Sequence, residues 1–113
     1  MAAKVTTRQY KRVDLVEVDG RIDSSTAPEL DEALQKIINA GRYRIVVDLA
    51  ETEFMSSAGL RTLIAALKQV HRFNRGDLRI SSMPSKIKKA FELVGLLELF
   101  KVYDNAVDAV GSF

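Results

Sequence analysis

The chain has 113 residues, with no cysteine, no tryptophan and a single histidine, His71. That length suits one domain, residues 1–113, and the 47% hydrophobic and 28% charged content is typical of a globular protein. The absence of cysteine excludes disulfide frameworks, thiol catalysis and thiolate metal sites, and one histidine disfavours a histidine-based metal site or relay. We therefore expect no metal. No Gly-rich phosphate loop or paired-carboxylate site is evident either, so we expect no catalytic residues and no cofactor.

The net charge of +2 is too small to indicate a nucleic-acid partner, but its distribution is uneven. Residues 14–32 hold seven acids and one base, whereas residues 68–89 hold seven bases and one acid. We interpret the two segments as possible docking faces for protein partners and expect no direct contact with nucleic acid.

The amino-terminal segment, residues 1–12, is basic and polar and lacks the apolar stretch of a signal peptide. The most apolar windows, residues 60–67 and 93–100, are too short to span a bilayer. We expect a cytoplasmic protein without membrane insertion.

The first half of the chain predicts two strands, a helix and a third strand. Residues 5–10 and 13–18 are rich in β-branched side chains and predict a hairpin ended by Gly20, followed by a polar loop over residues 23–25. A capping box of Thr26 and Glu29 predicts the start of a helix, and Gly41 its end. The apolar run at residues 44–49 predicts a strand buried on both faces, with a loop at residues 51–53.

The second half predicts two longer helices around a short strand. A helix follows the serine pair at residues 56–57, and residues 78–81 predict a strand. Pro84 opens the next helix, whose inward side chains are expected to be Ile87, Ala90, Phe91 and Val94, with Gly95 as its stop. A last strand is expected within residues 99–103, and Asp104 is expected to cap a final helical turn through Val110.

This order predicts an α/β fold. It has a mixed sheet of four to five strands, an N-terminal hairpin followed by βα units, with helices packed on the sheet and the later strands parallel.

The serine pair Ser56-Ser57 lies between a buried strand and an amphipathic helix. A serine at a helix start can cap the first backbone N–H groups. It can also accept a phosphate, which would lie at the positive end of the helix dipole, where Gly59 permits close backbone approach. Periodicity alone favours capping.

Four ordered segments resemble the STAS domain, the fold of bacterial anti-sigma factor antagonists. The matching segments are residues 20–23 with 27–30, residues 46–49 with 54–60, residues 91–96 with 99–100, and residues 105–110. The resemblance covers nearly the whole chain from about residue 13 onward, so it implies a single STAS-type domain.

The resemblance implies a partner-switching mechanism. In this family an anti-sigma factor, which is a GHKL-type serine kinase, phosphorylates the serine at the position of Ser57. The unphosphorylated antagonist binds that kinase and releases a sigma factor, and a PP2C-type phosphatase resets the switch. The protein would then be a substrate and not an enzyme, and a monomer or weak dimer.

The chain departs from the family pattern at Ser56, where the family often has Asp, so Ser56 is a competing phosphate acceptor. The expected partner surface comprises Asp23, Ser24, Ser56, Ser57, Ala58, Gly59 and Arg61. Asp23 has a simpler interpretation as a polar loop residue, and Arg61 as a solvated side chain.

Two other functions stay open. The domain could be a STAS regulatory subunit of a transporter of the lipid-trafficking ABC type, or of a secretion or signalling complex with no sigma factor. A nucleotide-binding or enzymatic domain is the third possibility.

Overall fold

The computed structural model describes residues 3–73 and 75–113. In chain order its elements are β1 (Lys4–Gln9), β2 (Asp14–Ile22), α1 (Ala27–Asn39), β3 (Arg44–Met55), α2 (Ser57–Val70), β4 (Asp77–Ser81), α3 (Ser85–Leu93), the 3-10 helix η1 (Leu97–Leu99), β5 (Val102–Tyr103) and α4 (Ala106–Gly111).

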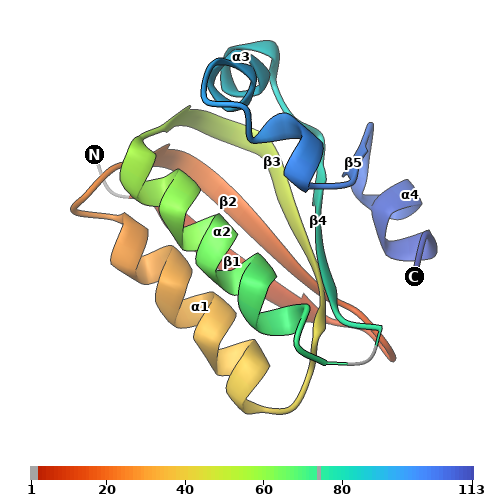
Figure 1. Ribbon diagram of the computed structural model, residues 1–113. Coiled ribbons are helices and arrows are strands. Elements are labelled where there is room, and N and C mark those ends of the chain that lie inside the picture. The colour runs from red at the N-terminus through yellow and green to blue at the C-terminus, as the bar shows by residue number, and fades with distance from the viewer. Residues whose placement is uncertain (1–2, 74) are drawn as a thin grey trace.

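The strands form one mixed sheet in the order β1-β2-β3-β4-β5. β1 and β2 pair antiparallel, and the other three pairings are parallel. Helices α1 and α2 lie side by side over one face, α3 lies at one end of the sheet, and α4 lies at its β5 side (Figure 1). The predicted fold class is confirmed.

Strand β3 lies at the centre of two hydrophobic clusters. On one face Val47 packs in the main core with Leu34 of α1 and Leu63 of α2. On the other face Val46 packs in a smaller cluster with Ala109 of α4. Both faces of β3 are therefore covered, which accounts for its continuous apolar run.

Strands β2 and β3 are longer than predicted. The expected loop at residues 51–53 is wrong, because β3 continues to Met55 and the buried Thr52 hydroxyl donates to the Val18 carbonyl at 2.9 Å. Gly20 does not end β2. It lies within the strand at φ +98°, where the pairing register with β3 shifts, so a left-handed residue absorbs the irregularity.

The predicted capping box is wrong. The Thr26 hydroxyl donates to the Arg21 carbonyl (2.8 Å) and accepts from the Asp23 N–H (2.9 Å), so it makes no cap bond within α1. Glu29 is exposed and makes no bond back to Thr26. Asp23 organises the loop before the helix instead, because its Oδ1 accepts from the N–H groups of Ser25 (3.0 Å) and Thr26 (3.2 Å).

The carboxyl-terminal third differs in detail. Helix α4 is capped by Asn105, whose side chain accepts from the Asp108 N–H at 2.8 Å, and not by Asp104. Val94 is 57% exposed rather than inward, because α3 ends one residue earlier. The expected stops at Gly41 and Gly95 are confirmed by their positive φ angles.

Candidate functional site

The connections that follow β2, β3 and β4 meet at one edge of the sheet, since these strands are parallel. We call this the carboxyl edge; it comprises the loop at residues 23–26, Ser56 with the start of α2, and residues 82–84. The Ser56 N–H donates to the Ile22 carbonyl at 2.8 Å, which ties the start of α2 to the end of β2.

The two serines of the pair differ in exposure. Ser57, the first residue of α2, is exposed. The hydroxyl oxygen of Ser56, the residue before the helix, is buried and has no hydrogen-bond partner in the described part of the chain. Ser56 makes no side-chain cap bond, so capping does not explain the pair.

The first turn of α2 carries unpaired donors. Its first intrahelical bond is from the Leu60 N–H to the Ser56 carbonyl, at 3.1 Å. The N–H groups of Ser57, Ala58 and Gly59 precede that bond and have no partner within the helix. No acidic residue occupies this turn, so the positive end of the helix dipole is uncompensated.

Gly59 has a packing role that differs from the expected one. It is buried, and its α-carbon lies against the side chains of Ile22 and Met55. The missing β-carbon therefore lets α2 approach the ends of β2 and β3, on the side turned toward the core.

Asp23 organises the loop before α1. Its carboxylate accepts from the Ser25 hydroxyl (2.7 Å) and from two backbone N–H groups. These bonds, the Ser25 hydroxyl first, lower the pKa of Asp23. The simpler interpretation of Asp23, a loop residue ahead of the helix, therefore has a structural basis, although the side chain also lies at the carboxyl edge.

Three of the expected partner residues line one open groove. Ser24, Ala58 and Arg61 border a space of about 420 Å3 between α1 and α2, together with Asp31 and four further small or apolar residues. Arg61 is exposed and follows Ser57 by four residues, so the two side chains share a face of α2. Asp23, Ser56, Ser57 and Gly59 do not line this groove.

The carboxyl edge also carries a cation–π pair that the sequence analysis did not predict. The Arg21 guanidinium carbon lies 4.4 Å from the centroid of the Phe54 ring, which is 37% exposed. The two residues pair across β2 and β3. The pair depends on the continuation of β3 through residues 51–53, which the sequence analysis assigned to a loop.

The buried carboxylate of Asp48 was also not identified in the sequence analysis. Asp48 Oδ2 accepts from the hydroxyls of Ser81 (2.9 Å) and Ser82 (2.8 Å), and Oδ1 accepts from the Ala50 N–H. These bonds join β3 to β4 just before the loop that leads into α3. Ser82 has φ +57°, a conformation that the sequence does not reveal.

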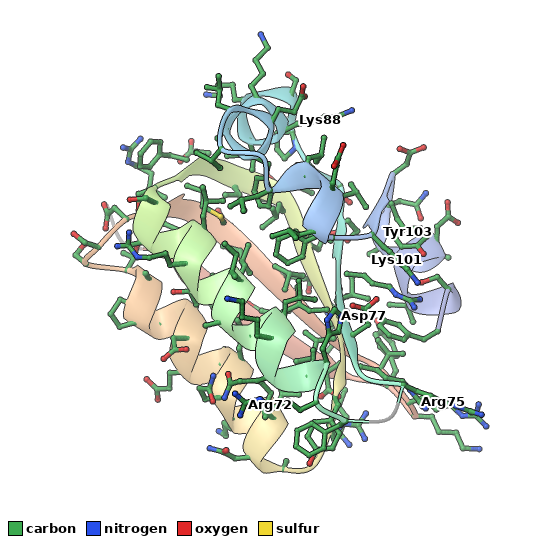
Figure 2. The ribbon with its side chains drawn as sticks, in the orientation of Figure 1. Arg72, Arg75, Asp77, Lys88, Lys101 and Tyr103 are labelled. Carbon is green, nitrogen blue, oxygen red and sulfur yellow. The ribbon has the colours of Figure 1, made fainter. Side chains whose placement is uncertain are left out.

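The basic segment at residues 68–89 does not form one face. Arg72 and Arg75 lie at one end of the molecule and Lys88 of α3 at the other (Figure 2). In the acidic segment, Asp14 is buried and paired with Arg42, so it presents no charge to a partner.

Within residues 3–73 and 75–113, no group of three or more acidic or histidine side chains is placed to hold a metal ion. The helices of the same residues are all too short or too polar to cross a membrane.

Comparison with known proteins identifies the family. The model of the STAS domain family matches residues 4–109. The anti-sigma-B factor antagonist of Staphylococcus aureus is 35% identical over 100 residues, which cover 88% of this chain and 91% of that protein.

Two solved structures have the same fold. An anti-sigma factor antagonist from Mycobacterium paratuberculosis superimposes with a TM-score of 0.84 at 25% identity, covering 97% of this chain and 92% of that one. The Bacillus anti-sigma factor antagonist SpoIIAA, in its unphosphorylated form, gives 0.82 at 14% identity over 95% and 93%.

The chain belongs to the STAS domain family. The relatives named above are anti-sigma factor antagonists, which confirms the class of protein that the sequence motifs predicted.

Proposed function

We propose that this protein is an anti-sigma factor antagonist that acts in the cytoplasm by partner switching, with Ser57 as its phosphate acceptor. Unphosphorylated, it binds an anti-sigma factor of the GHKL kinase type and releases a sigma factor. A PP2C-type phosphatase restores that form. The observation that carries the proposal is that Ser57, the first residue of α2, is exposed, whereas the hydroxyl of the neighbouring Ser56 is buried.

In the phosphoryl transfer, this chain supplies only the serine hydroxyl that accepts the phosphate. The Ser57 oxygen attacks the γ-phosphorus of ATP held by the kinase, the bond to ADP breaks, and the serine proton passes to a base of the kinase. Ser56 would have to leave its buried position to reach the same phosphorus. The phosphate on Ser57 would then lie near the free N–H groups that begin α2.

The phosphate can oppose binding in two ways. It adds a charge of about −1.5 to −2, which must be desolvated if the partner covers the start of α2. It also lies one helical turn from Arg61, and an ion pair between them withdraws that guanidinium from the groove that it lines. Both effects act on the surface formed by Ser24, Ala58 and Arg61.

The experiment starts with the partner. The tagged protein is copurified from its host, the bound kinase is identified by mass spectrometry, and both proteins are then combined in purified form with ATP. We expect one phosphate on the wild type and on Ser56→Ala, and none on Ser57→Ala. Phosphate carried by Ser57→Ala, or none on the wild type, would contradict the assignment.

The consequence for binding is measured separately by calorimetry. Ser57→Glu should weaken binding to the kinase, whereas Ser57→Ala should not. If the two variants bind the kinase with equal affinity, a negative charge at Ser57 does not control binding. The transporter-subunit alternative has less support from the relatives, and recovery of a permease in place of a kinase would favour it.

A further inference from the structure

Five basic side chains gather at the amino ends of the parallel strands, opposite the carboxyl edge. They come from four separate segments: Arg12 from the β1–β2 turn, Arg44 at the start of β3, Arg75 and Arg79 before and within β4, and Lys101 before β5. All five line one open cavity of about 520 Å3. We call this set the basic pole; Figure 2 labels Arg75 and Lys101.

One guanidinium of the basic pole is held firmly. Arg79, with only 12% of its side chain exposed, donates to Asp77 Oδ2 (2.9 Å) and to the Ser112 hydroxyl (2.7 Å). Its guanidinium carbon also lies 3.9 Å from the centroid of the Phe113 ring. The cavity therefore has a fixed cation in its wall, with an orientation set by three neighbours.

The other four cations are unbalanced. Within residues 3–73 and 75–113, Arg12, Arg44, Arg75 and Lys101 form no ion pair and no side-chain hydrogen bond. The carboxylate of the cavity, Asp77, is already engaged by Arg79 and by His71 at 2.9 Å. Burial raises the pKa of Asp77, but its bonds to Arg79 and His71 outweigh burial and lower it, so this carboxylate stays ionised and committed to them.

An excess of cations around a small cavity favours a multiply charged anion. Guanidinium groups suit phosphate because they form paired, charge-assisted hydrogen bonds with its oxygens. The volume is in the range of small-molecule sites. We propose that the basic pole binds a small polyanion carrying two or more phosphate groups, independently of the partner switch at Ser57.

Nearby aromatic rings argue against a single-stranded nucleic acid as the ligand. Single strands are held largely by stacking of bases on open rings. Phe73 is stacked on Tyr43, with centroids 3.7 Å apart, and Arg79 covers one face of Phe113. A compact ligand that contacts only the cations fits better.

The test is calorimetric titration with sodium tripolyphosphate at low ionic strength, using the full chain. We expect one site per chain and an affinity about tenfold lower in Arg44→Gln and in Arg75→Gln, because each removes a charge-assisted contact. Arg79 is left in place, because its loss would also remove the partner of Asp77. Lys88→Gln, at an exposed residue of α3, is the matched control and should leave the affinity unchanged.

Amide chemical shifts give a second measurement. Tripolyphosphate should shift the amide signals of Arg12, Gly76 and Lys101 and leave those of Ser57 and Gly59 in place. No saturable binding, an equal loss in Lys88→Gln, or tighter binding of a short DNA duplex that displaces tripolyphosphate would overturn the proposal. Ser57→Ala should bind tripolyphosphate with the affinity of the wild type. The binding result therefore does not depend on whether Ser57 is the phosphate acceptor of a partner switch.

Discussion

Gly59 of α2 packs directly on Ile22 of β2: a β-carbon at Gly59 would lie 2.7 Å from Ile22 Cγ2 and 2.8 Å from Met55 Cγ. Neither neighbour can withdraw freely, because both side chains are buried. Because Gly59 has no β-carbon, the first turn of α2 can lie close to the ends of β2 and β3.

Gly59→Ala should lower the free energy of unfolding by about 1–3 kcal/mol, the usual cost of overpacking, despite the better helix propensity of alanine. Urea denaturation measures it. The control is Gly111→Ala at the end of α4, where an added β-carbon meets nothing within 4 Å. If both variants shift the transition equally, the close approach of α2 to β2 is not what Gly59 provides.

Ser57→Glu should raise the free energy of unfolding by about 0.3–1 kcal/mol, because a negative charge compensates the start of the α2 dipole. High salt should reduce the gain. Thermodynamic coupling to Arg61→Gln in a double-mutant cycle should be about 0.3–0.5 kcal/mol, as for other pairs four residues apart on a helix. A stabilisation that ignores both salt and Arg61 would argue against an electrostatic origin.

Thr26→Ala should destabilise the protein by about 1–3 kcal/mol, because it leaves the Arg21 carbonyl and the Asp23 N–H without their partner in a part-buried loop. Glu29→Ala should change stability by less than about 0.5 kcal/mol, since Glu29 is exposed and outside any capping box. The two variants are compared by thermal unfolding. A loss in Glu29→Ala as large as that in Thr26→Ala would mean that Glu29 does complete a capping box.

The Asp77 pKa lies below its ordinary value of 3.8, so the ionised carboxylate stabilises the folded state above that pH. This contribution should disappear as the pH falls through the lowered pKa. Asp77→Asn should therefore be less stable than the wild type at pH 7, and the difference should shrink in strong acid. Asp104→Asn, at an exposed residue, is the control for urea denaturation. A difference between Asp77→Asn and the wild type that stays constant with pH would mean that ionisation of Asp77 does not contribute to the stability of the fold.

Much of the fold was readable from the sequence because apolar periodicity reports burial. The run at residues 44–49 and the stops at Gly41 and Gly95 are in the structure as predicted. The continuation of β3 through Thr52 could not be read, because it depends on a bond to Val18 in another strand.

The site was predictable to a different degree. Motif order located Ser57 at the start of α2, as the structure has it. The burial of the Ser56 hydroxyl, the Arg21–Phe54 pair and the basic pole arise only when distant segments meet. The local sequence pattern does not report contacts between segments that are distant in the chain.

The buried face of α2 bears on how quickly the protein can change partners. Leu63, Ala66 and Val70 have no exposed surface, so the hydrogen-bonded amides in the middle of this helix should exchange with solvent only when the whole domain opens. We therefore expect the helix that carries Ser57 to keep its structure when the protein changes partners. The lifetime of each complex would then follow from the rates of phosphoryl transfer, hydrolysis and dissociation, with no slow refolding step between them.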